Sequence, residues 1–207
     1  MRAAQPALVT PIAPPLVLVH GLWDTPRLFD SLQRELAGRR GPVLAPHLPH
    51  GLGQVPLEEL AEQLDRHITE RFGAETPVDL LGFSMGGVIS RAWIQLLAGH
   101  RRTRRFISVA SPQQGSWVAL PWPRRPLAGI ADMKPGSALL RKLQEEADLL
   151  ESVECCSFYC ATDLMVVPGW RAVLPVGPRK PLPRISHAEL MAHPASLALQ
   201  VEELVRA

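Results

Sequence analysis

The segment from residue 78 to 97 constrains the fold most, because it changes from a strand pattern to a helix pattern within one tight turn. VDLLGF is almost continuously apolar, as expected for a strand buried on both faces of a sheet. Apolar residues then recur at helical spacing up to Leu97. Between the two, Gly82 and Gly86 flank Ser84 and remove the β-carbons that would collide with the neighbouring strand and helix. The pattern predicts a sharp strand-to-helix turn, with a strained backbone at Ser84 and its side chain pointing outward.

Strand and helix patterns alternate along the rest of the chain as well. The predicted strands are LVLVHG (16–21), PVLAP (42–46), VDLLGF (78–83), FISVA (106–110), VECCSFYCA (153–161) and a sixth near Arg184–Ile185. The predicted helices begin at Pro26, capped by Asp24 or Thr25, and then cover 58–72, 85–97 and 194–205. This alternation predicts an α/β fold, in which a mostly parallel sheet carries helices on both faces. With 207 residues and a hydrophobic fraction of 46%, the chain is expected to form one domain over residues 1–207.

The segment 111–137 interrupts this alternation. It is rich in proline, glycine and tryptophan, and it is longer than most loops of compact domains, which indicates a functional insertion. We expect it to form a small cap or to line a pocket, with Trp117 and Trp122 contacting a substrate. Packing in the core is the alternative interpretation for both tryptophans.

Composition and charge argue against several classes of function. A net charge of +2 and a pI near 8.6 give no strong attraction to nucleic acid, and the basic run RRTRR at 101–105 is predicted to be a solvated loop. No apolar run approaches the length of about 18 residues that a membrane span needs.

Cys155, Cys156 and Cys160 share one apolar run, so we predict buried free thiols rather than metal ligands. Unpaired cysteines favour a reducing, cytoplasmic compartment. The N-terminal stretch has no apolar core typical of a signal peptide, although a secreted protein whose leader had been removed would look the same.

Ser84 is the candidate nucleophile. A serine hydroxyl needs a base to take its proton and an acid to orient that base. In a parallel sheet these groups should lie on loops at the carboxyl ends of later strands. Asp163, directly after the strand 153–161, is the predicted acid, with a helix cap or turn residue as its alternative role and Asp132 as the rival acid.

His187 is the predicted base, because it follows the last strand and completes the order serine, acid, histidine. His193 is the rival, although it directly precedes Pro194 at the start of the closing helix. His47 and His50 are interpreted as surface or pocket-lining residues, since the sequence shows no third metal ligand near them. We predict neither a metal nor an organic cofactor.

An oxyanion formed during acyl transfer needs fixed hydrogen-bond donors. The backbone N–H of Met85, directly after the serine, is one predicted donor. The N–H of Leu22 in the loop HGLWDT is the second, with Trp23 as the alternative. Trp23 is also predicted to contact the substrate. His20 is interpreted as a structural residue that shapes this turn.

The segments LVLVHGLWDT, LLGFSMGGVISR, FISVASPQQGSW and ATDLMVVP together resemble the small bacterial lipases and esterases of the α/β-hydrolase superfamily, especially minimal, triacylglycerol-lipase-like ones. The likeness extends from about Leu16 to the C-terminus, and the serine-centred motif is its most specific part. The resemblance implies an acyl-ester hydrolase with Ser84 as nucleophile, Asp163 as acid and His187 as base. It also implies a reduced sheet of about six strands.

Two places depart from the family pattern. Gln113 and Gln114 stand where such proteins often carry two histidines, and Phe83 stands before the serine where a histidine is common. Neither place carries the proton transfers, so the departures bear on substrate preference.

The expected activity is hydrolysis of carboxylic esters of short to medium acyl chains, in a small-molecule ester or lipid, through an acyl-enzyme. A thioesterase, amidase or acyltransferase could use the same triad. A non-catalytic protein that binds lipids or a partner is a further alternative, and the intact set of three residues argues against it. The sequence does not indicate an oligomeric state, and a monomer is compatible with it.

Overall fold

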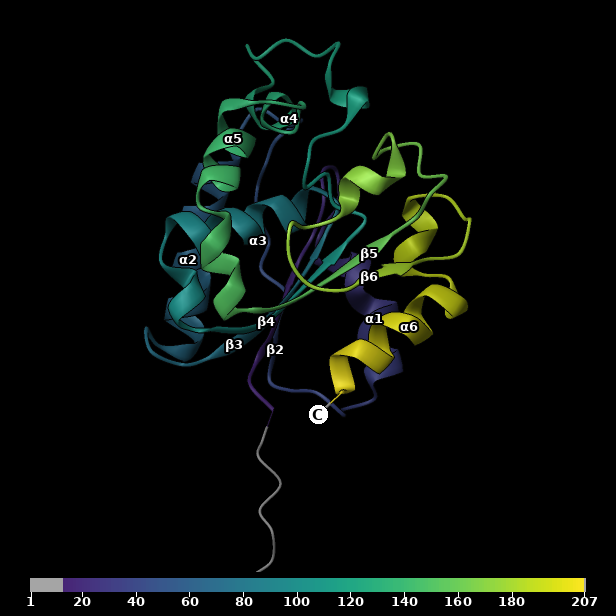
Figure 1. The fold of residues 1–207 in the computed structure, drawn as a ribbon. Coiled ribbons are helices and arrows are strands. Elements are labelled where there is room, and N and C mark those ends of the chain that lie inside the picture. The colour runs from purple at the N-terminus through teal and green to yellow at the C-terminus, as the bar shows by residue number, and fades with distance from the viewer. Residues whose placement is uncertain (1–12, 207) are drawn as a thin grey trace, which may run out of the picture.

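The computed structural model describes residues 13–206, which contain a six-stranded sheet in the order β2-β1-β3-β4-β5-β6 (Figure 1). Every neighbouring pair of strands is parallel. The strands are β1 Leu16–Val19, β2 Val43–Leu44, β3 Val78–Phe83, β4 Thr103–Val109, β5 Glu154–Tyr159 and β6 Arg179–Pro181. The predicted α/β fold with about six strands is confirmed, and the described sheet is parallel throughout.

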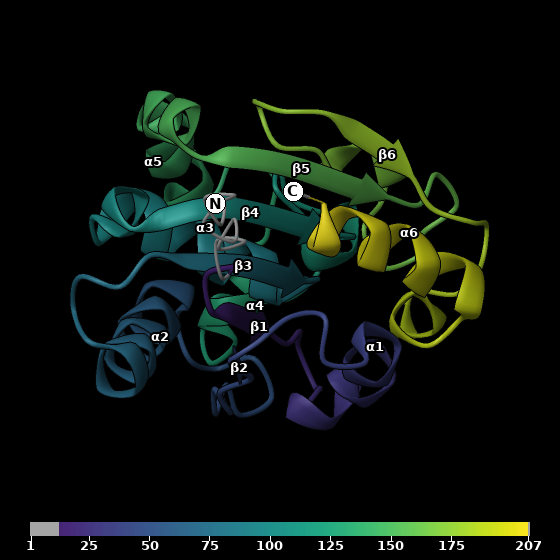
Figure 2. The ribbon, with the colours of Figure 1, turned by 90° about the horizontal axis from the view of Figure 1, so that it is seen from below.

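Helices cover both faces of this sheet (Figures 1 and 2). The α-helices are α1 Asp30–Leu36, α2 Leu57–Phe72, α3 Met85–Leu96, α4 Ala128–Asp132, α5 Ala138–Glu145 and α6 Pro194–Val205. Short 3₁₀ turns lie at Pro26–Phe29, Gly99–Arg101, Trp117–Ala119, Ala147–Ser152, Gly169–Ala172 and Ala188–Met191. Helices α2 to α5 pack on one face, and α1 and α6 pack on the other.

β1 is apolar along its whole length because both of its faces are buried. In β1, Val17 and Val19 point into the cluster under α2 and α3, while Leu16 and Leu18 point into the cluster under α1 and α6. All four side chains are fully buried. Because successive side chains of a strand point to opposite faces of the sheet, one short apolar run contributes to both cores.

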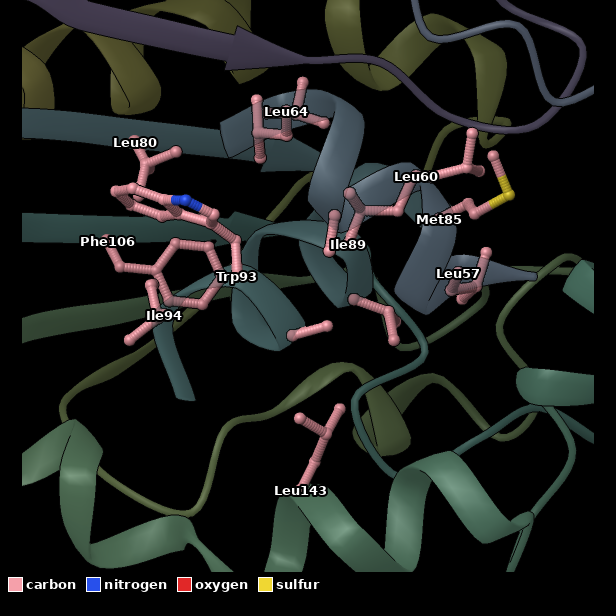
Figure 3. Close-up of a cluster of buried hydrophobic side chains, with 14 of the residues drawn as sticks. Leu57, Leu60, Leu64, Leu80, Met85, Ile89, Trp93, Ile94, Phe106 and Leu143 are labelled. Atoms are coloured by element: carbon pink, nitrogen blue, oxygen red, sulfur yellow. The ribbon is translucent and has the colours of Figure 1, made fainter. Parts of the chain in front are cut away.

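The larger core is built around Trp93 of α3, which is fully buried (Figure 3). Its ring lies beside Leu80 of β3 and Phe106 of β4. Its indole N–H donates a 2.8 Å hydrogen bond to the Asp65 carboxylate on α2, so the one polar atom of the ring is satisfied. This packing fixes α3, and therefore the residue at its N-terminus, against the sheet.

The basic run at 101–105 is not the solvated loop that its charges predicted, because β4 begins inside it. Arg105 is only 1% exposed, and its Nε donates to the Glu154 carboxylate at 3.0 Å. The neighbouring Arg104 donates to the buried Asp79 at 2.9 Å. Acids on adjacent strands thus satisfy the charges and allow this charged sequence to enter the sheet.

The sixth strand also lies elsewhere than predicted, at Arg179–Pro181 and not near Arg184–Ile185. It pairs with β5 as an edge strand, where Ser157 lies opposite Arg179. Its residues are charged or partly exposed, so the hydrophobic pattern carried no signal for it.

The first helical segment begins as predicted at Pro26, but as a 3₁₀ turn that continues into α1 from Asp30. The residue at the cap position is Thr25, and its side chain makes no capping hydrogen bond. The alternative cap, Asp24, lies in a cavity described below. The predicted side-chain cap is therefore wrong for both residues.

The three cysteines are free and buried, as predicted. Cys155 belongs to the core under α3, whereas its neighbour Cys156 belongs to the core under α6. Burial raises the pKa of Cys155 to about 12 and that of Cys156 to about 11, so both remain neutral thiols.

Among residues 13–206, no helix has both the length and the apolarity needed to cross a bilayer.

Both ends of the described chain lie at the end of the sheet where the strands begin (Figure 1). The buried Arg40 ties them there, since it donates to the carbonyl oxygens of Pro14 and Leu204, each at 2.8 Å. Arg105 adds a 3.0 Å hydrogen bond to the carbonyl of Arg206. The opposite end, where the strands finish, carries the loops that follow the strands, and α4 lies there within the segment 111–137.

Candidate active site

The predicted strained turn is present at Ser84. β3 ends at Phe83, α3 begins at Met85, and Ser84 between them has φ 53° and ψ −127°. A non-glycine residue in such a conformation costs on the order of 1–3 kcal/mol, which the packing of β3 and α3 must supply.

Two glycines make the turn possible. A β-carbon on Gly82 would lie 2.5 Å from Cα of Gly87, and one on Gly86 would lie 2.0 Å from the carbonyl oxygen of Val19 in β1. Both distances are far below van der Waals contact with backbone atoms that cannot move aside. Only glycine at these positions lets α3 start directly behind the serine and lie against β1.

Ser84 lies in a cavity of about 130 Å³ at the carboxyl ends of the strands. Most of the lining is apolar, and the lining residues are Leu22, Trp23, Asp24, Ser84, Pro112, Ser116, Val118, Ala119, Trp122, Ile130, Met133, Met165, Val166 and His187. An apolar cavity with a few convergent polar groups is the usual form of a small-molecule site. Trp23 and Trp122, both predicted to contact a substrate, line this cavity, whereas Trp117 does not and is 52% exposed.

His187 and Asp163 meet beside the serine. The Nδ1 atom of His187 lies 2.7 Å from Oδ2 of Asp163, whose side chain is 1% exposed. The other oxygen of Asp163 accepts the backbone N–H groups of Met165 and Val166 at 2.7 and 3.1 Å. The carboxylate is an acceptor only, so Nδ1 carries the proton and Nε2 has a free lone pair.

The ring of Phe83 packs against His187 with centroids 4.8 Å apart, which helps to hold the imidazole in place. Ser84 and His187 line the same cavity. Within the described chain, the Ser84 hydroxyl makes no hydrogen bond to His187. In unliganded sites such contacts are commonly long and tighten when substrate binds.

The predicted oxyanion donors lie on two elements that meet at the serine. Met85 is the first residue of α3, and the first N–H groups of a helix have no intrahelical acceptor. Leu22 lies on the loop after β1 and lines the cavity. The alternative donor is already engaged, since the Trp23 N–H donates to Nε2 of His50 at 3.2 Å.

His50 was not recognised from the sequence as part of this arrangement. It is 7% exposed, and its Nδ1 lies 2.7 Å from the carbonyl oxygen of Gly51, so Nδ1 donates and Nε2 accepts the Trp23 N–H. Trp23 itself has a φ of 62°, an uncommon value for a bulky residue, and this hydrogen bond helps to hold it there.

His20 has the structural role that the sequence indicated. Its Nδ1 lies 3.0 Å from the carbonyl oxygen of Gly21, and its Nε2 accepts the Leu48 N–H at 3.1 Å. Burial lowers the pKa of His20, and the nearby His50 and His47 lower it further. His20 and His50 together fix the loop that carries Leu22.

The rival acid and base have other tasks. Asp132 accepts the Leu57 N–H at 3.0 Å at the start of α2 and pairs with Arg124 at 2.9 Å. His193 caps α6, where its Nδ1 accepts the Ala195 N–H. Neither residue lines the cavity.

The segment 111–137 is tied to the loop that carries Asp163. The Ser116 hydroxyl donates to the carbonyl of Met165 at 2.8 Å and accepts the Val167 N–H at 3.0 Å. The Trp117 N–H donates to the Val167 carbonyl at 2.9 Å. These bonds position Ser116 in the cavity wall and hold the two loops together.

Comparison with known proteins identifies the class. The sequence model described as the alpha/beta hydrolase family matches residues 16–204, and the chain belongs to this family. A curated relative, described as the lysosomal thioesterase PPT2 homolog of Drosophila melanogaster, is 32% identical over 107 residues, which are 50% of this chain and 37% of that protein. The chain thus matches little more than a third of that relative.

Solved lipase structures share the fold. The mature form of Bacillus licheniformis lipase BlEst2 superimposes with a TM-score of 0.72 over 96% of this chain and 94% of that one, at 16% identity. The propeptide form of the same lipase superimposes with a TM-score of 0.75 at 14% identity, and the match covers 96% of this chain and 51% of that longer one. Aspergillus fumigatus lipase B superimposes with a TM-score of 0.73 at 17% identity, and the match covers 97% of this chain and 55% of that one. The chain resembles a small lipase or esterase of the α/β-hydrolase fold.

Proposed function

We propose that the protein is a serine carboxylic-ester hydrolase. The observation that carries the proposal is the meeting of Ser84, on its strained turn, with His187 in one apolar cavity, while Nδ1 of His187 bonds to the buried Asp163 at 2.7 Å. In a serine hydrolase, a histidine held by an acid at Nδ1 can accept the proton of the nucleophile at Nε2.

In the proposed reaction, Nε2 of His187 takes the proton of Ser84 while the serine oxygen attacks the ester carbonyl. The N–H groups of Leu22 and Met85 stabilise the oxyanion, and His187 returns the proton to the leaving alcohol. Water, deprotonated by the same histidine, then releases the acid and restores the serine. Asp163 keeps the imidazole in the required tautomer and stabilises its charged form.

The cavity supports short to medium acyl chains as substrates. Its volume of about 130 Å³ is comparable to that of an apolar cavity of ~150 Å³ that binds a benzene-sized group, so a short acyl chain fits. Longer chains would have to extend past Trp122 and Met165, which are exposed at its margin.

Thioester hydrolysis is the second candidate, favoured by the relative described as a thioesterase. The triad serves both bonds, since only the leaving atom differs. Matched butyryl esters and butyryl thioesters would separate them, and a higher kcat/KM on the thioester would make the protein a thioesterase.

Labelling with a fluorophosphonate, which reacts with activated serines, tests the proposed nucleophile. We expect one adduct on wild type, none on Ser84→Ala, and normal labelling of Ser90→Ala, whose serine is buried within α3 away from the cavity. Equal labelling of Ser84→Ala and wild type would refute the proposal.

The acid is tested by a matched pair of substitutions. Asp163→Asn should lower kcat on nitrophenyl butyrate by about 10³- to 10⁴-fold, because an amide favours the wrong histidine tautomer. Asp132→Asn, at the rival acid, should leave kcat within about twofold, since it lies outside the cavity. A series of nitrophenyl esters of increasing chain length tests the acyl preference, which a clear optimum at long chains would contradict.

A further inference from the structure

The cavity contains one charged group that the proposed reaction does not use, the carboxylate of Asp24. It lies on the loop after β1. Its Oδ2 atom and the β-carbon of Ser84 each lie 2.9 Å from the point where a β-carbon on Gly21 would stand. The carboxylate is therefore next to the candidate nucleophile.

Asp24 is partly buried, and it differs from the buried carboxylates of residues 13–206. Those are all paired, namely Asp79 with Arg40 and Arg104, Asp132 with Arg124 and the Leu57 N–H, Asp163 with His187 and two backbone N–H groups, and Glu203 with Lys180 and Arg206. Within residues 13–206, the side chain of Asp24 forms no ion pair and accepts no hydrogen bond.

Asp24 is an acidic side chain that faces a mostly apolar lining. Burial raises the pKa of Asp24, while the nearby His187 and His50 act in the opposite direction. An unpaired negative charge against apolar walls is unfavourable, and a cation brought by a ligand would compensate it.

A second side chain in the same place also favours a cation. Trp23 lines the cavity beside Asp24 and is 57% exposed, so a face of its indole ring is accessible to a ligand. Aromatic faces attract ammonium groups, and tryptophan does so most strongly. A carboxylate and an indole together attract an ammonium group and repel an anion.

The position of Asp24 assigns this cation to one part of the substrate. The leaving alcohol must lie toward His187, because it receives its proton from that residue. Asp24 and His187 are the ionisable side chains of an otherwise mostly apolar lining, so we assign both to the side of the alcohol. The apolar wall formed by Val118, Ile130 and Met133 is left for the acyl group.

We propose that Asp24 and Trp23 form a subsite for a positively charged group in the alcohol part of the substrate. The enzyme then prefers esters of ammonium-bearing alcohols to neutral esters of the same shape. This inference rests on the proposed ester hydrolysis.

Butyrylcholine and 3,3-dimethylbutyl butyrate test it, because they have the same shape and differ by the replacement of the quaternary nitrogen with carbon. We expect wild type to favour the cationic ester in kcat/KM, and Asp24→Asn to lower this ratio about two- to fivefold, as for a partly exposed ion pair. Asp30→Asn removes the same charge from an exposed site on α1 and should change the ratio less than about twofold. An unchanged ratio in Asp24→Asn, or a wild-type preference for the neutral ester, would overturn the subsite and leave the esterase proposal intact.

Choline binding, measured by tryptophan fluorescence, tests the subsite without turnover. Asp24→Asn should raise the Kd for choline by the same two- to fivefold, with little effect on the Kd for 3,3-dimethylbutanol. If wild type cleaved neither ester but bound choline in an Asp24-dependent way, the proposed reaction would be wrong and the subsite would stand. Choline binding that is absent or independent of Asp24 would overturn the subsite.

Discussion

The strain at Ser84 predicts an unusual order of stabilities. Ser84→Ala and Ser84→Gly both remove the hydroxyl, so their difference isolates the backbone conformation at φ 53° and ψ −127°. Glycine relieves strain of about 1–3 kcal/mol. It also frees the unfolded chain, which costs about 0.4–1 kcal/mol. The net expectation is that Ser84→Gly is more stable than Ser84→Ala by about 1 kcal/mol, or roughly 2–4 °C in Tm.

Ser90, two turns further along α3, provides the matched control. It is buried and helical, so glycine there should be less stable than alanine by about 0.5–1 kcal/mol. Urea unfolding of the four variants would show differences of opposite sign at the two positions. If Ser84→Gly proved less stable than Ser84→Ala, the backbone at Ser84 would not be strained and the reasoning would be refuted.

Three further predictions concern stability. Gly86→Ala should lower the free energy of unfolding by about 4 kcal/mol, because the alanine β-carbon would lie 2.0 Å from the Val19 carbonyl oxygen. Urea unfolding measures this loss, and a loss below about 1 kcal/mol would contradict the prediction. Burial raises the pKa of Asp24 in the folded state, so ionisation of this group opposes folding above that pKa. Asp24→Asn should therefore raise Tm by roughly 1–3 °C at pH 7 and leave it unchanged at pH 3. An equal rise in Tm at both pH values, measured by calorimetry, would disprove this. Burial lowers the pKa of His20 below 6.5, so on acidification the unfolded chain takes up this proton first and stability falls as pH drops through 6.5. His20→Asn should reduce the slope of the free energy of unfolding against pH by an amount equivalent to the uptake of up to about one proton. An unchanged slope between pH 7 and 5 would show that His20 does not cause the pH dependence.

The sequence predicted those parts of the molecule that depend on local pattern. The turn at Ser84 was recognisable because its strand, glycines and helix are contiguous, and the helices α2, α3 and α6 each carry an apolar stripe. The closeness of Asp163 and His187 followed from topology, since the loops after parallel strands meet at one edge. Their catalytic roles stay predictions.

Features that depend on distant partners were not predictable. The bond from Trp23 to His50 joins positions 27 residues apart, and nothing in the segment PHLPHG indicates an acceptor for that N–H. Asp24 looked like a helix cap, because the sequence does not show that its side chain turns toward the cavity. Arg105 looked solvated because its acid, Glu154, is 49 residues away.

Both ends of the described chain are attached where the strands begin, and this has a practical consequence. The cavity lies at the opposite end of the strands, because its lining includes Ser84 and other residues of the loops that follow the strands. A tether joined to the described chain at residue 206 would start beside the hydrogen bonds from Arg40 and Arg105, at the end of the strands opposite to Ser84. Coupling to a bead or a sensor surface through that end would orient the molecules uniformly, with the cavity mouth toward the solution.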